Sequence, residues 1–186
     1  MPQMPFLKTL LQILLLFLFA LGSNSCVKDV DIDQAKDIAL KPKLQIDLLI
    51  FDVNEADFVD TLTNQQKNII RDTVRLEFLD DSYIQDDLME VEFSFKYINS
   101  FSQSFHSKIS FLSENNGVQH GVEFNINPGA KNNPAVTEVI DLIKFDQIQV
   151  IRRSIKMLVE IEALPSNNPF TGELKFQSKG LFSFEF

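Results

Sequence analysis

The sequence predicts an all-β protein: an antiparallel β-sandwich of about seven or eight strands with one or two short helices. Three observations lead to this fold class. From residue 43 onward, apolar and polar residues alternate with the period of two that half-buried strands require. Short polar stretches with proline, glycine or asparagine separate these runs, so that successive strands follow closely. The chain also holds 18 Phe and no Trp, and phenylalanine fills a core without a polar atom that needs a partner.

The first two predicted strands lie on either side of a long polar stretch. One face of the first strand carries Leu44, Ile46, Leu48 and Ile50. Leu49 and Phe51 make the far end of that strand apolar on both faces. Residues 54–71 are polar and irregular, with a short helix predicted near 55–61. The second strand is predicted over 73–79, where apolar residues again alternate with charged ones.

The middle of the chain predicts a turn, a long strand and a hairpin. Residues 80–87 have the character of a turn or a one-turn helix. The next strand carries a clean apolar stripe of Met89, Val91, Phe93, Phe95 and Tyr97. The dipeptide Asn116-Gly117 tolerates positive φ at both positions and predicts a two-residue hairpin loop. With that loop, apolar residues meet on one face of the hairpin. The predicted pairs are Phe111 with Val122, Ile109 with Phe124, and Ser107 with Ile126.

A loop over 128–134 leads to a short predicted strand over 136–140. Apolar residues then recur at helical spacing, with Asp141 ahead of them and Arg152 and Arg153 at the end, where cations suit the helix dipole. These apolar residues are Leu142, Phe145, Ile148 and Ile151. The pattern predicts a short helix.

Two more strands complete the predicted sandwich, on either side of a turn over 165–172. The earlier strand, over 155–161, carries Ile155, Met157, Val159 and Ile161 on one face. The last strand places Leu174, Phe176, Phe182, Phe184 and Phe186 on one face. The chain lacks the Cys…Trp…Cys pattern of antibody domains, so an immunoglobulin-like arrangement is possible on architecture alone.

Length and composition favour one acidic domain and exclude several function classes. The chain has 186 residues and a formal net charge of −9. That acidity argues against a nucleic-acid partner, because neutralising phosphates requires clustered Lys and Arg. The single cysteine excludes an internal disulfide and a zinc site built from several thiolates.

The amino-terminal segment predicts an export signal over residues 1–25. Lys8 follows a free amino terminus, residues 10–21 are almost entirely apolar, and small residues precede Cys26. The apolar run is shorter than the roughly 20 residues that span a bilayer, which disfavours a retained membrane anchor. The segment resembles the lipobox of bacterial lipoproteins, of the relaxed kind found in Bacteroidetes, with Ser23 in place of the usual Leu. That resemblance implies that Cys26 carries a lipid and becomes the first residue of the mature protein.

Residues 26–42 form a predicted acidic tether, and residues 43–186 form the sandwich domain. The tether contains Asp29, Asp31, Asp33 and Asp37. This stretch is similar to the signal that sends Bacteroidetes lipoproteins to the outer face of the outer membrane. It fails as a calcium-binding EF-hand loop, because Gln34 and Leu40 stand where such a loop needs Gly and Glu. Removal of residues 1–25 would take away one cation, Lys8, and leave a net charge of −10.

The residues that could carry catalysis do not form a recognisable site. In the predicted hairpin, His106 and His120 lie on opposite faces and roughly 23 Å apart along the sheet. Neither has a recognisable acidic partner in the sequence, and no serine lies in a G-x-S-x-G elbow. The acidic pairs at 80–81 and 86–87 flank Tyr83 in a short connection, where they are expected to be solvated. We therefore expect no enzymatic activity, no cofactor and no metal site.

Two function classes remain after these exclusions. The first is a non-enzymatic protein-interaction module of the cell envelope, a monomeric domain held at the outer membrane, and at the cell surface, by the lipid on Cys26. The second is a glycan- or ligand-binding accessory lipoprotein of a nutrient-uptake system, although the absence of Trp weakens sugar binding. An apolar patch on a predicted polar strand face would favour the first. A pocket between the sheets lined by Tyr83 or Tyr97 would favour the second. Over its whole length the chain is similar only to small uncharacterised lipoproteins of flavobacterial type.

Overall fold

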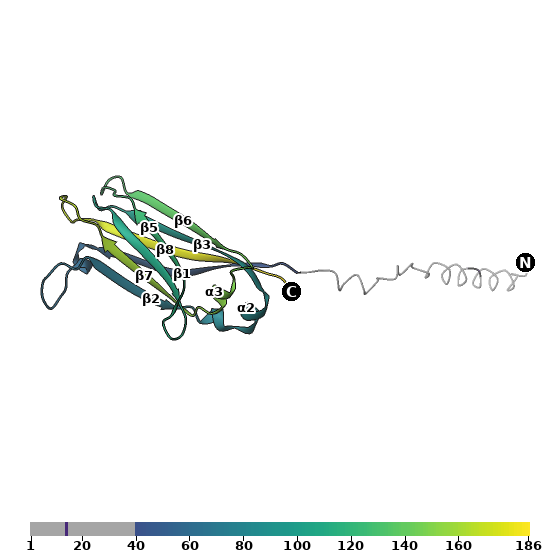
Figure 1. Ribbon diagram of the computed structural model, residues 1–186. Coiled ribbons are helices and arrows are strands. Elements are labelled where there is room, and N and C mark those ends of the chain that lie inside the picture. Colours follow the sequence, from purple (N-terminus) through teal and green to yellow (C-terminus); the bar gives the residue numbers. More distant parts are fainter. Residues whose placement is uncertain (1–13, 15–39) are drawn as a thin grey trace, which may run out of the picture. The chain divides into compact units, whose positions relative to one another are not determined.

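A computed structural model describes Leu14 and residues 40–186 of the chain. Eight strands within 40–186 form two antiparallel four-stranded sheets, which face each other as two layers (Figure 1). Two short α-helices and two 3₁₀ helices lie in the connections between strands. The predicted all-β sandwich is therefore confirmed. The predicted leader, Cys26 and the tether up to residue 39 lie outside the described residues.

The strand bounds follow the predicted order along the chain. The first sheet contains β1 (Lys43–Asn54), β8 (Glu173–Phe184), β3 (Leu88–Asn99) and β6 (Ala135–Ile143). The second sheet contains β2 (Ile69–Arg75), β7 (Lys156–Ala163), β4 (Phe105–Leu112) and β5 (Val118–Ile126). The helical segments are η2 (Glu55–Phe58), η3 (Glu77–Asp80), α2 (Ser82–Asp87) and α3 (Gln149–Arg152).

The strand order is that of a jelly roll. The two sheets run β1-β8-β3-β6 and β2-β7-β4-β5. The chain thus pairs β1 with β8, β2 with β7, β3 with β6 and β4 with β5, like one long hairpin wrapped across two layers. This is the eight-stranded jelly-roll topology. An immunoglobulin-like arrangement does not apply, because it places its first two strands side by side in one sheet, whereas β1 and β2 lie in different sheets.

The two ends of the sandwich differ. Leu40 and Phe186 exchange backbone hydrogen bonds of 3.3 and 3.0 Å, and α2 and α3 lie at the same end (Figure 1). We call this the terminal end. The loop end, opposite, is formed by the connections over 55–68, 100–104, 127–134 and 164–172. Leu40, where the described part of the domain begins, therefore lies at the terminal end, away from these loops.

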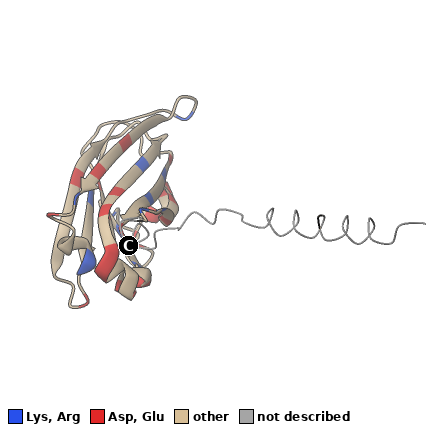
Figure 2. Ribbon diagram, turned by 90° about the vertical axis from the view of Figure 1, so that its right-hand side faces the viewer, with Lys and Arg blue, Asp and Glu red and all other residues tan. Residues whose placement is uncertain are grey.

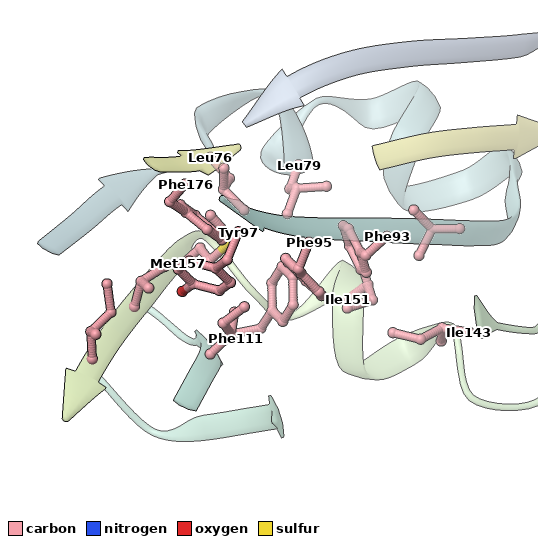
Figure 3. Packing of buried hydrophobic residues seen from close by; sticks show 14 of the residues in the cluster. Leu76, Leu79, Phe93, Phe95, Tyr97, Phe111, Ile143, Ile151, Met157 and Phe176 are labelled. Carbon is pink, nitrogen blue, oxygen red and sulfur yellow. The ribbon is translucent and has the colours of Figure 1, made fainter. Parts of the chain in front are cut away.

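Phenylalanine dominates the space between the sheets. Phe93 is fully buried, with its ring centroid 4.5 Å from that of Phe111 on the opposite sheet. Tyr97 packs on Phe176 at 4.6 Å. Figure 3 shows these side chains pointing into one continuous core with Phe95, which is also fully buried. Burial of large aromatic surface is the main stabilising term in such a layer.

Two β-bulges shift the side-chain alternation away from the predicted faces. A register shift between Asp47 and Leu49 leaves Leu48 as the extra residue of β1. Beyond it the alternation reverses, so Ile50 lies on the outer face and is 58% exposed. The prediction that Ile50 shares the inner face is therefore wrong. A second bulge, at Met89, brings Leu88 into the core and leaves Met89 only half-buried. One inserted residue reverses every later side chain.

The β4–β5 hairpin has a longer loop than predicted. Ile109 pairs with Val122 rather than Phe124, a shift of two residues. A turn closed by the Asn116 N–H on the Ser113 carbonyl (3.0 Å) precedes Gly117, and Asn116 has φ of 60°. The predicted register is thus wrong by two residues. The predicted inner and outer faces of the hairpin are still correct, because a shift of two residues keeps each side chain on its own face.

Two predicted elements end at different residues from those observed. The second strand was predicted over 73–79 but spans Ile69–Arg75, and the η3 turn follows it. The helix predicted from Leu142 to Ile151 contracts to the four residues of α3, since Leu142 belongs to β6. In both places, hydrogen bonding to a neighbouring strand, rather than the local sequence pattern, sets where the element ends.

Tyr97 carries a buried hydroxyl with a single hydrogen-bond partner. Its hydroxyl lies 2.8 Å from the Oγ of Ser107, and both residues are fully buried. Burial raises the pKa of the Tyr97 phenol well above its usual value. Unfolded tyrosine ionises near pH 10, so above that pH the unfolded chain loses a proton that the folded chain keeps. Ionisation therefore favours the unfolded state.

We expect Tyr97→Phe to weaken the alkaline loss of stability. In the parent protein, this one group lowers the free energy of unfolding by up to about 1.4 kcal/mol per pH unit above pH 10. Urea unfolding at pH 9, 10 and 11 measures the slope. Tyr83→Phe is the control, because Tyr83 is 39% exposed, and it should retain the parent slope. Equal slopes in Tyr97→Phe and the parent protein would contradict the assignment.

Candidate functional site

The outer face of β6 carries an exposed apolar row. Val136, Ile140 and Leu142 are 55%, 60% and 44% exposed, and Glu138 is the only charged residue between them on that face. The alternate residues of β6 face inward, and Ile143 is buried in the core. The strand is thus apolar on both faces, although one of them meets solvent. Such a surface is typical of an interaction site rather than of a solvated sheet face.

The neighbouring strand gives this row a partly polar border. In the register with β3, Val136 lies beside Ile98, and Ile140 lies beside Ser94. The Ser94 hydroxyl donates to the carboxylate of Glu138 at 3.1 Å. Acidic residues are more widespread than basic ones along the ribbon of the domain (Figure 2). We refer to Val136, Glu138, Ile140 and Leu142 as the β6 row.

β6 is also an edge strand with an open side. It is hydrogen bonded to β3 along its whole length without a bulge, and in the described residues no backbone hydrogen bond joins its other side to any segment. Two side-chain contacts connect β6 to β5 of the other sheet and to the residue that follows β5. They are the Asn127 N–H donating to the Thr137 hydroxyl at 3.1 Å and the His120–Asp141 pair. These contacts close the gap between the sheets and leave the strand edge open.

Both histidines have acidic neighbours, which corrects the prediction that neither does. His120 Nε2 lies 2.6 Å from Asp141 Oδ2, and His106 Nε2 lies 3.8 Å from Glu123 Oε2. Asp141 comes from the other sheet, so no local sequence pattern could reveal the contact. The two rings still lie on opposite faces, because His120 pairs with Phe111, five residues from His106 along β4. That spacing is about 17 Å rather than the predicted 23 Å.

The His120–Asp141 pair ties the edges of the two sheets together. In the described residues, no hydroxyl or thiol hydrogen bonds to either imidazole. A nucleophile positioned by a base would require such a contact. Nor do three His, Cys, Asp or Glu side chains of residues 40–186 gather closely enough to hold a metal ion.

A hollow of about 610 Å³, with both polar and apolar lining, lies at the loop end. The connections after β3, β5 and β7 form its walls, with Glu55 of η2 at its rim. Pro134 and Pro169 supply apolar surface, and Lys131 and Lys175 supply cations. Lys175 lies 3.2 Å from Glu173, which is also in the lining. The volume falls in the range of small-molecule sites.

The loops around this hollow are held in place by a buried amide and two glycines. The Asn99 side chain donates to the carbonyls of Gln103 and Asn127 and accepts from the Phe101 N–H, at 2.8 to 2.9 Å. At Gly129, a Cβ would lie 1.9 Å from the Asn99 carbonyl oxygen, and Gly172 has φ of +151° against Phe101. The loop end is therefore a preformed surface rather than a set of independent loops.

The other residues singled out in the sequence do not contribute to either surface. Tyr97 is buried in the core, and Tyr83 packs beside Phe184 with ring centroids 5.9 Å apart. Neither tyrosine lines the hollow. Asp80, Asp81 and Asp86 are exposed, as predicted for solvated carboxylates. None of the helices in the described residues has the length and apolar run needed to cross a membrane.

The β6 row is the candidate site that the sequence did not predict. Val136 and Ile140 fell in a predicted strand, but Leu142 fitted the spacing of a helix. The available signal was the run Val139-Ile140-Asp141-Leu142-Ile143, in which apolar residues lie at odd and even positions and therefore on both faces of a strand. Such a run predicts a strand buried on both faces or one that meets a partner.

Comparisons with known proteins reveal only distant structural likenesses. No protein-family model matches the chain, and no curated protein matches it. The VP2 subviral particle of infectious bursal disease virus is 8% identical, with a TM-score of 0.42 over 78% of this chain and 33% of that one. A candidate secreted protein from Parabacteroides distasonis is 13% identical, with a TM-score of 0.44 over 61% of this chain and 37% of that one. A tailspike protein of bacteriophage CBA120 is 11% identical, with a TM-score of 0.39 over 77% of this chain and 19% of that one. This chain spans well under half of each of these proteins, and we draw no functional conclusion from them.

Proposed function

We propose that this chain is an outer-membrane or cell-surface lipoprotein whose jelly-roll domain is a non-enzymatic protein-interaction module of the envelope. The observation that carries the proposal is the exposed β6 row. Three large aliphatic side chains on one edge strand expose apolar surface to water at a cost of about 25 cal/mol per Å². Contact with a protein partner would remove that cost. An exposed apolar face on a strand is the feature that distinguishes this function from ligand binding, which would need a pocket.

The cellular location in this proposal rests on the amino-terminal sequence. A lipid on Cys26 would hold the domain through the 14 residues before Leu40, which can span at most about 50 Å. The tether would join the domain at Leu40, at the terminal end, so the β6 row and the loop end would both stay accessible. Attachment to the membrane raises the effective concentration at a partner in the same membrane, so a weak interface would suffice.

The second candidate function is a glycan- or ligand-binding accessory lipoprotein of a nutrient-uptake system. The hollow at the loop end supports it, because its walls are preformed and carry both cations and carboxylates. Its lining contains no aromatic side chain, and flat aromatic platforms are the usual support for sugar rings. The hollow therefore ranks below the β6 row as the site of the main function.

The test compares the two candidates on the same protein. The lipidated protein, carrying an affinity tag, is recovered from its native host and its bound proteins are identified. In parallel, the soluble domain is applied to a glycan array. We expect one reproducible envelope protein that is lost with Ile140→Lys and kept with Ile50→Lys, the matched exposed isoleucine of β1. Reproducible glycan binding without a protein partner would reverse the order of the two candidates.

A further inference from the structure

We propose that β6 binds its partner by strand addition, with an extended apolar and basic segment of an envelope protein hydrogen bonding along the open edge of β6. This inference rests on the proposed function and specifies the partner's chemistry. Strand addition joins main-chain hydrogen bonds, which give affinity, to side-chain contacts at alternate positions, which give specificity. The β6 row supplies those alternate contacts.

Each of the other three sheet edges carries a bulge, a cation or both, and β6 carries neither. The edge strands are β1 and β6 in one sheet and β2 and β5 in the other. β1 contains a bulge and the charged residues Lys43, Asp47 and Asp52. β2 contains two arginines and an aspartate in seven residues, and β5 has a glycine and a register shift. Proteins commonly use bulges and charges, lysine above all, to prevent edge pairing.

The sequence of β6 favours pairing. Its nine residues, AVTEVIDLI, contain no lysine, arginine, proline or glycine. Five of the nine are valine, isoleucine or threonine, the residue types most suited to strands. In an antiparallel sheet, about half of the backbone N–H and C=O groups of an edge strand point away from its neighbour. In residues 40–186, those groups of β6 have no backbone partner.

The charges on β6 define the partner's chemistry. Glu138 and Asp141 are its two charged residues, and both are acidic. Asp141 is held by His120 between the sheets, which leaves Glu138 as the carboxylate of the β6 row. Lys96 of β3 lies opposite Glu138 on one side, and the open edge lies on the other side. A segment with apolar residues opposite Val136, Ile140 and Leu142 and a cation beside Glu138 therefore complements the edge. Opposite charges placed across neighbouring strands stabilise the pairing.

A second copy of this chain fits the edge less well. Antiparallel pairing of β6 with another β6 would invert one domain relative to the other. Because β6 runs from the loop end to the terminal end, the two Leu40 residues would then point in opposite directions. Two lipid tethers in one membrane leaflet oppose that arrangement, whereas a segment of a partner protein does not.

Hydrogen exchange on the lipidated protein in detergent micelles tests this inference. The probe is the synthetic peptide Thr-Val-Thr-Val-Thr-Lys-Thr-Val-Thr, which in antiparallel register places valines opposite Leu142, Ile140 and Val136 and its lysine beside Glu138. We expect the peptide at millimolar concentration to slow exchange of the β6 amides about tenfold, with no change in β2. The same peptide N-methylated at alternate residues, which removes the donors of one edge, should give no protection.

Two variants make the result specific to the β6 edge. Ile140→Lys should weaken peptide binding about tenfold, because it removes an apolar contact with a peptide valine and adds a cation two residues from the site of the peptide lysine. Ile50→Lys adds the same charge to the outer face of the opposite edge strand and should bind like the parent. Equal losses in both variants, no binding, or binding that leaves β6 exchange unchanged would each overturn strand addition. If the protein is a dimer without peptide and its β6 amides already exchange slowly, the edge binds a second copy of the chain. That result would overturn the proposal of a partner segment. Loss of strand addition would leave the proposed function standing if an envelope protein is still recovered through Ile140.

Discussion

Replacement of Phe93 by alanine is expected to cost about 3–5 kcal/mol of unfolding free energy. Phe93 is fully buried at the centre of β3, and its ring contacts aromatic rings of both sheets: Phe111 at 4.5 Å, and Phe95 and Phe182 at about 6 Å. Truncation to alanine removes the apolar burial of the ring and leaves a cavity that the two sheets cannot close. Urea unfolding of the soluble domain, beginning near Pro42, measures the change.

The matched control for this change is Phe145→Ala. Phe145 follows β6 and is 60% exposed, so its truncation should change the unfolding free energy by no more than about 0.5 kcal/mol. A Phe93→Ala variant as stable as the Phe145→Ala variant would show that the inner face of β3 is wrongly assigned. A far-UV circular dichroism spectrum dominated by helix would contradict the fold itself.

The replacement Cys26→Ser is expected to abolish lipidation and release the domain from the membrane fraction. The chain has one cysteine, and the proposal makes its thiol the only covalent link to lipid. One acyl chain gives marginal membrane binding and two or more give stable attachment, so complete loss of the lipid should move the protein almost entirely to the soluble fraction. Labelled palmitate and fractionation measure both effects.

The control for lipidation is Ser23→Leu. It leaves Cys26 intact and restores the residue that the usual lipobox places three positions before the cysteine. Labelling should therefore persist in this variant. Palmitate incorporation that is undiminished in Cys26→Ser would rule out Cys26 as the anchor.

The sequence predicted the sandwich because period-two alternation is a local property of each strand. The stripe of β3 and the inner face of β8 were both predicted, and Phe93, Phe95, Phe176 and Phe182 are all fully buried. The positions of the bulges could not be predicted, since nothing local to Leu48 or Met89 requires an extra residue. The bulge at Leu48 then moved Ile50 to the opposite face from the one predicted.

The candidate site was harder to predict than the fold, because it depends on which strand becomes an edge. Val136, Ile140 and Leu142 are ordinary core residues in sequence. They are exposed because they lie on the outer face of the sheet, and the strand edge is open because β6 pairs with β3 alone. The His120–Asp141 contact also joins two sheets through residues 21 positions apart. Both features arise from strand order, which alternation along the chain does not encode.

Photocrosslinking in the native host tests the central claim, docking of a protein on the β6 row, most directly. A photoreactive amino acid replaces Ile140 in the full-length protein, and in a second strain it replaces Ile50, which is almost equally exposed on the outer face of the same sheet. The account predicts one discrete crosslinked envelope protein from position 140 and none of that identity from position 50. Identical crosslinking patterns from both positions, or no protein crosslink from position 140 with normal membrane attachment, would contradict it.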